Sequence, residues 1–320
     1  MLSDFRSHCL SAAFIDELPS FALADGTVRR MGAEVDCLRV HAASSLAAVR
    51  VVGEDALLTS GEDGRVCRTE TNGRCREVGS VPRKWITSVA QSRGRIAYAA
   101  GKTVWLHSSS GALQMQHGRS IKGICLTVDG TRLAVAQQDC VTVHDLDVAG
   151  EPLELPWNDI NTAATFSPDG RFLVIAAQKC FLHGWRLSDR KHFRMLGYQG
   201  RVDEWAWSSD GAFLATSGAP AAIVWPFADD DGPMSRNAVE VALRVGRTVT
   251  AVAWRPDTRH LAVGYDDGQV QLASADDGAS ARPLNDAGQG PITSMAWNRN
   301  GRKIAVGSAA GECGVLAVDA

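Results

Sequence analysis

One short unit recurs along this chain, and its clearest copy runs from Arg201 to Phe227. The copy holds three apolar runs of strand length, at residues 202–207, 212–217 and 222–225. The breaks between the runs carry Ser, Asp, Gly and Pro, which are the residue types that favour turns. Repetition of such a unit predicts an all-β chain in which every copy folds as a small antiparallel sheet.

The spacing of the copies predicts how many strands each sheet contains. The first runs of eight copies begin at residues 10, 46, 86, 121, 162, 202, 249 and 292. These starts lie about 40 residues apart, which is the spacing of four-stranded propeller blades. Asp-Gly pairs at 129–130, 169–170 and 210–211 separate first from second runs, and Gly reaches positive φ there without steric cost. We therefore predict one β-propeller domain over residues 1–320, with eight four-stranded blades favoured over seven.

The two ends of the chain are expected to meet in one sheet. The last copy, at residues 292–318, reaches the C-terminus without a fourth strand. Residues 1–7 precede the first copy and can supply that strand. Pairing of the N- and C-terminal strands would close the ring and remove exposed sheet edges. In the seven-bladed alternative, the divergent copy at residues 10–31 is not a blade.

Large aromatic residues recur at one position of the first runs. Trp207, Trp254 and Trp297 occupy it in three copies, and Phe166 occupies it in a fourth. The runs around them are apolar at almost every position, which is typical of a strand covered on both faces. We expect these rings to pack between neighbouring blades, because each buries a large apolar area.

The composition fits a folded protein and gives no sign of a nucleic-acid or membrane partner. The chain has 320 residues, 45% of them hydrophobic, and a net charge of -3. That charge does not favour binding to nucleic acid or to an anionic membrane surface. No apolar run approaches the ~18 residues of a membrane helix, and the first 20 residues lack the apolar segment of a secretory signal. We expect a cytoplasmic monomer without a cofactor.

Eight cysteines are spread through the chain without a C-x-x-C pair, which favours reduced thiols in a cytosol. Cys67 and Cys75 flank a Thr-Asn-Gly turn and can face each other across a hairpin. The candidate metal ligands are Cys140, Cys180, His183 and the pair His8-Cys9. Equivalent positions in neighbouring blades are expected to lie too far apart for a tetrahedral site, so we predict no bound metal.

Several motifs resemble those of the WD40-repeat β-propeller family, over essentially the whole chain. They are Ser-Pro-Asp-Gly at 167–170, Ala-Thr-Ser-Gly at 215–218, and Trp185 and Trp225 in third runs. The resemblance implies a ring of four-stranded blades that assembles other proteins and is not catalytic. The repeats are degenerate, as in bacterial members.

The repeats depart from the family in one respect. Well-formed members hold a His, a Ser or Thr, an Asp and a Trp in a hydrogen-bonded set within a blade. The second copy here has His41, Ser60 and Asp63, but Arg68 stands near the place of the Trp. The sixth has Ser217 and Trp225 with neither His nor Asp. The departure predicts that apolar packing, more than this network, holds the blades together.

The segments that lead from a fourth run to the next first run would lie on one face, beside the central channel. They carry residue types that are enriched at interface hot spots, namely Arg83, Lys84, Trp85, Arg119, Trp157, Tyr198, Arg201 and Arg247. We predict that these residues bind a protein or peptide partner of acidic character, because Arg makes bidentate contacts to carboxylates. The alternative is that these loops are simply solvated.

Two other function classes stay open. A propeller hydrolase or lactonase would use a metal at the channel mouth, and Asp203 and Glu204 on a first run are paired carboxylates for acid–base work. No second cluster completes such a site, and no Ser-His-Asp or Gly-rich phosphate signature is present in the sequence. A metal-handling accessory protein would instead use the cysteines.

Overall fold

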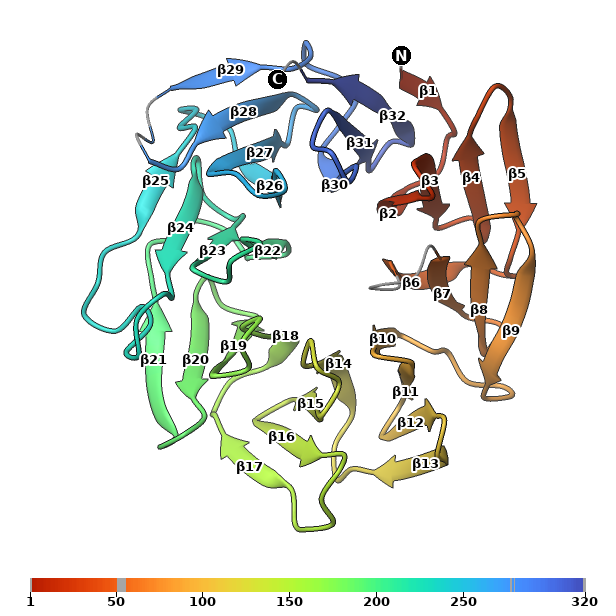
Figure 1. Ribbon diagram of the computed structural model, residues 1–320, viewed down its shortest axis with the longest axis vertical. Helices are drawn as coiled ribbons and strands as arrows, with labels where there is room; N and C mark the ends of the chain where they lie inside the picture. Colours follow the sequence, from red (N-terminus) through yellow and green to blue (C-terminus); the bar gives the residue numbers. More distant parts are fainter. Residues whose placement is uncertain (1, 51–55, 277, 279, 319–320) are drawn as a thin grey trace. The chain divides into compact units, whose positions relative to one another are not determined.

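A computed structural model describes residues 2–50, 56–276, 278 and 280–318. The described residues form 32 β-strands and no helix, and the strands make eight antiparallel four-stranded sheets (Figure 1). Consequently, no helix in this part of the chain is long and apolar enough to cross a membrane. Each sheet is one blade, and the fold is the predicted eight-bladed β-propeller. The seven-bladed alternative is wrong, because residues 9–39 form a complete four-stranded sheet.

The blades divide into two compact units of four blades each. The first unit comprises residues 1–37 and 195–320, and the second comprises residues 38–194. In the first unit the strands are β1 (Leu2–Asp4), β2 (Cys9–Ile15), β3 (Leu18–Leu23), β4 (Thr27–Met31), β5 (Val35–Arg39), β22 (Trp205–Trp207), β23 (Phe213–Thr216), β24 (Ala222–Pro226), β25 (Val239–Val241), β26 (Val249–Trp254), β27 (His260–Tyr265), β28 (Val270–Ser274), β29 (Ala281–Pro283), β30 (Ile292–Trp297), β31 (Lys303–Ser308) and β32 (Glu312–Ala317). In the second unit they are β6 (Ser45–Arg50), β7 (Ala56–Gly61), β8 (Arg65–Glu70), β9 (Cys75–Ser80), β10 (Ser88–Ser92), β11 (Arg95–Ala100), β12 (Thr103–Ser108), β13 (Gly111–Gln116), β14 (Ile121–Leu126), β15 (Arg132–Gln137), β16 (Cys140–Asp145), β17 (Leu153–Pro156), β18 (Asn161–Phe166), β19 (Phe172–Ala177), β20 (Leu182–Arg186) and β21 (Lys191–Met195).

The N-terminal strand completes the C-terminal sheet. β1 pairs antiparallel with β32, with Leu2 opposite Gly314. The contact continues beyond the strand, where the backbone N–H of Phe5 donates to the carbonyl of Gly311 at 2.9 Å. The Phe5 ring then packs at 6.4 Å from that of Phe21 in the next blade. The prediction that residues before the first copy supply the missing strand is confirmed, although Met1 lies outside the described residues.

Three of the four recurring aromatic residues of the first strands pack between blades, as predicted, whereas Trp207 is half-buried and packs against Phe227 of its own blade, with ring centroids 4.7 Å apart. Trp254 and Trp297 are buried, and each indole N–H donates at 3.0 Å to a carbonyl of the preceding blade, Ala206 and Ala253 respectively. Phe166 is buried in a cluster with Ala134 and other apolar residues of the preceding blade. These rings therefore fix neighbouring blades by apolar burial and, for the tryptophans, by a hydrogen bond that the sequence did not predict.

The Asp169-Gly170 and Asn300-Gly301 turns make a second contact between blades. The Arg132 guanidinium donates to the Gly170 carbonyl at 2.7 Å, and that of Arg255 donates to the Gly301 carbonyl at 2.8 Å. Both glycines have positive φ, 69° and 66°. A Cβ atom at Gly170 would lie 2.5 Å from Arg132. Glycine is thus favoured there by the backbone conformation, and a side chain would displace the Arg132 guanidinium from its hydrogen bond.

The first strand of the opening copy is shorter than predicted. β22 covers only Trp205–Trp207, and Asp203 and Glu204 precede it. Their backbone N–H groups both donate to the Ser217 hydroxyl, at 3.3 and 3.0 Å, so a side chain replaces part of the strand pairing. Six other first strands have a register shift near their start. The placement of the two carboxylates on the strand was therefore wrong.

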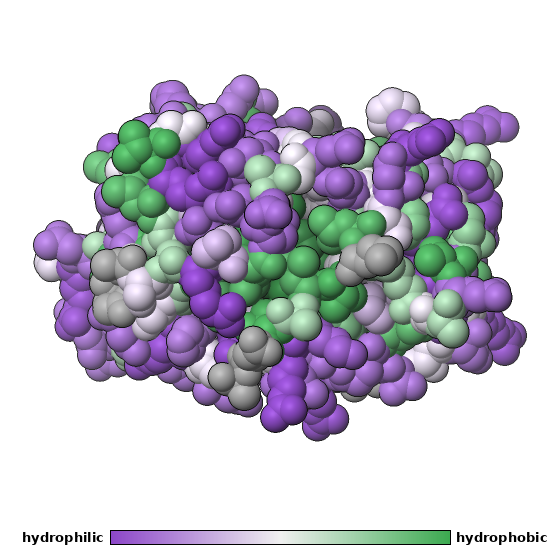
Figure 2. All heavy atoms as spheres, turned by 90° about the horizontal axis from the view of Figure 1, so that it is seen from above, coloured by the Kyte–Doolittle hydropathy of each residue, from purple (hydrophilic) through white to green (hydrophobic). Residues whose placement is uncertain are grey.

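Two very short edge strands lie at the top of Figure 1, β29 and β1, each of three residues. They leave part of the neighbouring β28 and β32 uncovered. Figure 2 views the molecule from that side and shows apolar side chains between hydrophilic ones. Short edge strands of this kind limit the pairing of a sheet with other chains.

Candidate partner-binding surface

The loops that precede the first strands are held to the blades that they leave. In four of them, a backbone N–H donates to a carbonyl at or near the turn between the second and third strands, at 2.7 to 3.0 Å. The donors are Val81, His117, Trp157 and Arg244, and the acceptors are Gly64, Lys102, Asp139 and Pro220 in the same order. Because this bond recurs, it places one residue of each loop at an equivalent position, and the side chain of that residue enters the following blade.

In the loop that enters the second blade, His41 holds this position, because it lies four residues before its first strand as His117 and Trp157 do. It makes part of the WD40-type network. One ring nitrogen of His41 lies 2.9 Å from the Thr59 hydroxyl, and the other lies 3.0 Å from the Asp63 carboxylate. The sequence prediction chose Ser60 for the hydroxyl, which was wrong, because neighbouring strand residues point to opposite faces. The Ser60 hydroxyl instead donates to the Ile86 carbonyl at 2.9 Å.

In the sixth blade the same place is taken by Tyr198, a residue predicted to contact a partner. Its hydroxyl lies 2.8 Å from that of Thr216 and accepts a hydrogen bond of 2.8 Å from the Trp225 indole. Tyr198 is 9% exposed, and burial raises its pKa to about 12. The structure thus uses its polar group inside the sheet, and we leave it out of the proposed surface.

The Trp157 side chain is half-buried and, like Tyr198, makes contacts within the protein. Its ring stacks on His183 with centroids 3.5 Å apart, and the Arg194 guanidinium lies 4.9 Å above it. His183 is fully buried, and among the described residues neither of its ring nitrogens has a hydrogen-bond partner. Burial lowers its pKa to about 3. The contact role predicted for Trp157 therefore competes with this packing role.

Arg244 was missed by the sequence prediction. It makes a bidentate ion pair with Asp267 at 3.0 and 2.9 Å, and it lies 4.6 Å above the Tyr265 ring. Alignment of the loops on His41 and Trp157 would have found it, because all three occupy the equivalent position. Because its charge is neutralised by Asp267, we expect Arg244 to stabilise the loop and not to contact a partner.

The β9–β10 loop, residues 81–87, presents the most accessible set of predicted residues. Arg83, Lys84 and Trp85 are exposed, and the Trp85 side chain is 61% exposed. The flanking Val81 and Ile86 are buried. Among the described residues, neither cation of this loop forms an ion pair. The loop thus combines two available cations with an exposed indole.

The other three predicted arginines are exposed but are already paired with nearby carboxylates. The pairs are Arg119 with Asp139 at 2.9 Å in the second unit, and Arg201 with Asp203 at 2.5 Å and Arg247 with Asp267 at 3.2 Å in the first. An exposed pair contributes little to stability, but it reduces the charge offered to a partner. These three arginines therefore have a carboxylate partner within the protein, in contrast to Arg83 and Lys84.

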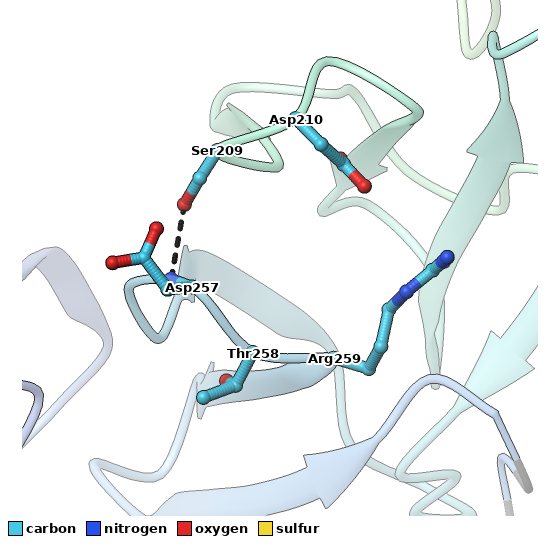
Figure 3. Close-up of a pocket in the computed structure, with 5 residues that line it drawn as sticks. All are labelled: Ser209, Asp210, Asp257, Thr258 and Arg259. Carbon is cyan, nitrogen blue, oxygen red and sulfur yellow. Dashed lines mark hydrogen bonds between the residues drawn. The ribbon is translucent and has the colours of Figure 1, made fainter.

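An open pocket of about 480 Å³ lies elsewhere, between the turns that join first to second strands in two blades of the first unit. It is lined by Ser209, Asp210, Asp257, Thr258 and Arg259 (Figure 3). The backbone N–H of Asp257 donates to the Ser209 hydroxyl at 3.3 Å. Asp210 and Arg259 point toward each other. The pocket holds no histidine or cysteine, and its opposite charges face one another, so it offers no acid–base pair.

The residues considered for metal or acid–base chemistry are not brought together. The part of the chain that the structure describes contains no group of three or more His, Cys, Asp or Glu residues that could hold a metal. Cys140 is half-buried, and Cys180 is exposed. Burial, with a smaller effect of Asp203, raises the pKa of Glu204 to about 8. This shift favours the protonated form of Glu204, while the neighbouring Asp203 carboxylate is exposed and already ion-paired with Arg201.

Comparisons with known proteins support the resemblance to WD40 repeats over a short stretch. Residues 239–287 match the family model of the anaphase-promoting complex subunit 4 WD40 domain. A stretch of 52 residues is 38% identical to cell division cycle 20.1, cofactor of the APC complex, of Arabidopsis thaliana. That stretch is 16% of this chain and spans only 11% of the length of the relative.

Solved structures show the same fold over most of the chain. The computationally designed Ika8 protein superposes with a TM-score of 0.78 at 17% identity, covering 99% of this chain and 98% of its own. A chain of the mitotic checkpoint complex has a TM-score of 0.66 at 15% identity and covers 83% of this chain and 85% of its own. At these identities the likeness supports the fold alone.

Proposed function

We propose that this protein is a WD40-type, non-catalytic interaction scaffold that binds an acidic protein or peptide segment through the β9–β10 loop. The observation that carries the proposal is the exposed Trp85 next to Arg83 and Lys84. An aromatic ring and an arginine that are not used in folding are the residue types that dominate interface energetics. The two relatives found by sequence, a complex subunit and a complex cofactor by name, support a function in protein assembly.

The loop is held in a defined shape before any partner arrives. The backbone N–H of Val81 donates to Gly64 at 2.7 Å, and that of Ile86 donates to Gly61 at 3.2 Å. Between these anchors, Arg83 adopts a left-handed φ of 63°, which turns the chain sharply. Because little conformational freedom is left to lose, the loop can bind with a small entropic cost.

The charges favour a partner with carboxylates and an apolar side chain. Arg83 can form a bidentate contact with a carboxylate, while Trp85 offers an apolar surface and one N–H donor. Arg119 is expected to contribute less, because Asp139 already lies 2.9 Å away.

Selection from a displayed random peptide library tests the proposal. We expect enriched peptides to contain Asp or Glu next to an aromatic or aliphatic residue. Their affinity should fall at least about tenfold for Trp85→Ala and for the double variant Arg83→Glu, Lys84→Glu, corresponding to the ~1.4 kcal/mol or more of a contact residue. Lys191→Glu, an equally exposed charge reversal on the outer strand β21, is the matched control and should bind normally.

Equal binding of the selected peptides to the wild type and to the Trp85 and double variants would contradict the assignment of the surface. Failure to enrich any peptide that binds the folded protein would contradict the scaffold function itself. No observation favours the hydrolase or the metal-handling alternative, so neither is pursued.

We also propose five further properties of the protein that the sequence predicts. They are a single domain over residues 1–320, a monomeric state, a cytoplasmic location, a bacterial source, and a partner other than nucleic acid or membrane. A single cooperative unfolding transition and elution at about 34.2 kDa in size-exclusion chromatography would support the first two.

A further inference from the structure

Two thiols are brought together on the outer side of the second blade. Cys67 lies on β8 and Cys75 on the edge strand β9, where Cys75 is directly opposite Thr69. Cys67 is two residues from Thr69, so both cysteines project from the same face of the sheet. The two cysteines are therefore diagonal neighbours across the strand pair, and their thiols interact electrostatically.

The two thiols have opposite surroundings. Cys67 is fully buried, whereas Cys75 is exposed to solvent. Contact with Cys67 and, more weakly, the charge of Arg65 lower the pKa of Cys75 to about 7. The same contact and burial raise the pKa of Cys67 well above its ordinary value. Cys75 is therefore the thiol of the pair that ionises first, while the Cys67 S–H donates to the buried Val40 carbonyl at 3.3 Å.

We propose that Cys75 and Cys67 form a peroxide-sensitive thiol pair in which Cys75 is the reacting sulfur and Cys67 is the resolving one. The pairing is independent of the proposed partner-binding function. An exposed thiolate with a second thiol in contact is the arrangement that converts a sulfenic acid into a disulfide.

Both steps balance with hydrogen peroxide as the only oxidant. The Cys75 thiolate attacks one oxygen of the peroxide; an S–O bond forms, the O–O bond breaks, and hydroxide leaves. The Cys67 sulfur then attacks the sulfenic sulfur of Cys75; an S–S bond forms, and the oxygen leaves as water with the Cys67 proton. The two sulfurs together lose two electrons, and the peroxide gains them.

Closure of the disulfide requires a small shift of one strand, because diagonal neighbours in a sheet are farther apart than directly opposed ones. β9 is the edge strand of its sheet, and no residue in it is fully buried. Val78 is the β9 residue that packs against the core, so the Cys75 end of the strand can move toward β8 without displacing a buried side chain. The strand runs directly into the β9–β10 loop, so oxidation would also act on the start of that loop.

A second cysteine pair provides a control within the same protein. The thiols of Cys9 and Cys313 also interact electrostatically, but both are fully buried. Burial and mutual contact raise the pKa of Cys9 well above its ordinary value. Proximity alone would make the two pairs equally reactive, whereas the proposal requires an exposed thiolate and therefore predicts that Cys9 and Cys313 stay reduced.

The experiment treats the full-length, folded protein with one to a few equivalents of hydrogen peroxide, blocks the remaining thiols and identifies the products by peptide mass spectrometry. We expect a Cys67–Cys75 disulfide in the wild type, and a Cys75 sulfenic acid trapped by dimedone in Cys67→Ser. Without oxidant, Cys75 should be alkylated at pH 7 roughly ten times faster than the exposed Cys37, with a rate that rises through pH 7.

Three results would overturn the proposal. The first is alkylation of Cys75 no faster than that of Cys37. The second is oxidation of Cys75 in the wild type to a sulfinic acid while Cys67 stays free. The third is a Cys9–Cys313 disulfide that forms before the Cys67–Cys75 one. Because rates and products are read on the wild type, a folding defect in Cys67→Ser would not remove the test.

Discussion

The indole N–H of Trp225 donates a hydrogen bond of 2.8 Å to the Tyr198 hydroxyl, which also lies 2.8 Å from the Thr216 hydroxyl. Thr216 continues the chain by donating to the Ile223 carbonyl at 3.0 Å. A tyrosine in the loop thus links the second and third strands of its blade, whereas His41 links Thr59 on the second strand of another blade to Asp63 in the turn after it. The network is retained in form although its residues have changed.

Tyr198→Phe should destabilise the protein by about 1–3 kcal/mol, because the buried Trp225 N–H loses its acceptor. Denaturant unfolding measures the loss. Tyr98→Phe is the matched control and should cost less, because the partner of its hydroxyl, His107, is only partly buried. An unchanged unfolding midpoint for Tyr198→Phe would show that the hydrogen bonds are energetically neutral.

His183→Phe should reduce the sensitivity of the protein to acid. Burial lowers the pKa of His183 from 6.5 to about 3. Between these values the unfolded chain binds a proton that the folded protein rejects, so wild-type stability falls as the pH drops below about 6.5. The difference in free energy of unfolding between the variant and the wild type should therefore shift in favour of the variant by on the order of 2 kcal/mol between pH 7 and pH 4.5.

Free energies of unfolding at the two pH values test this prediction. His192→Phe, a change of an exposed ring in contact with the same cluster, serves as the control. The prediction is wrong if His183→Phe and the wild type lose stability in parallel between pH 7 and pH 4.5.

Glu204→Gln should reduce the sensitivity of the protein to alkaline pH, whereas His183→Phe reduces its sensitivity to acid. Burial raises the pKa of Glu204 from 4.5 to about 8. The folded protein therefore binds a proton more tightly than the unfolded chain, and this contribution to stability is lost as the pH rises from about 4.5 to 8. The glutamine stays neutral, so the variant should gain on the order of 2 kcal/mol relative to wild type between pH 5 and pH 8.

Thermal or denaturant unfolding at pH 5 and pH 8 measures that relative gain. Glu240→Gln changes an exposed carboxyl of the same unit and should show no such gain. Identical pH dependence in Glu204→Gln and wild type would mean that Glu204 is ionised in the folded protein.

Removal of residues 1–6 should destabilise the protein by on the order of 3 kcal/mol, because β1 and the packed Phe5 ring are lost. The freed edge of β32 should also promote self-association. Calorimetry and light scattering measure the two effects. A synthetic peptide of residues 1–7 should restore both when added, whereas a scrambled peptide should not. Unaltered unfolding of the truncated chain would contradict the role of β1.

The blade pattern was predictable because it rests on local chemistry. Asp-Gly turns such as 169–170 and the apolar runs around Trp254 and Trp297 report which residues bend and which are covered on both faces. Blade number and the pairing of β1 with β32 followed from counting these signals. Errors arose where a side chain replaced a backbone partner, as Ser217 does before β22.

The candidate surface was predictable only in part. The sequence placed Arg83, Trp85, Trp157 and Tyr198 in equivalent loops and so could not rank them. The structure shows that Tyr198 is buried and that Trp157 stacks on His183, while Trp85 is exposed. The direction of a loop side chain depends on contacts with the next blade, and a repeat pattern in the sequence carries no such information.

The sequence by itself determined the all-β class, the four-stranded repeat and the completion of the last sheet by the N-terminus, because turn residues and apolar periodicity are local properties. Only the tertiary structure decided which polar groups are used up in folding and which remain available. That distinction separates Tyr198 from Trp85, and the buried Cys67 from the exposed Cys75. Burial and pKa depend on atoms that are distant in the chain, so they become defined only when the blades have assembled.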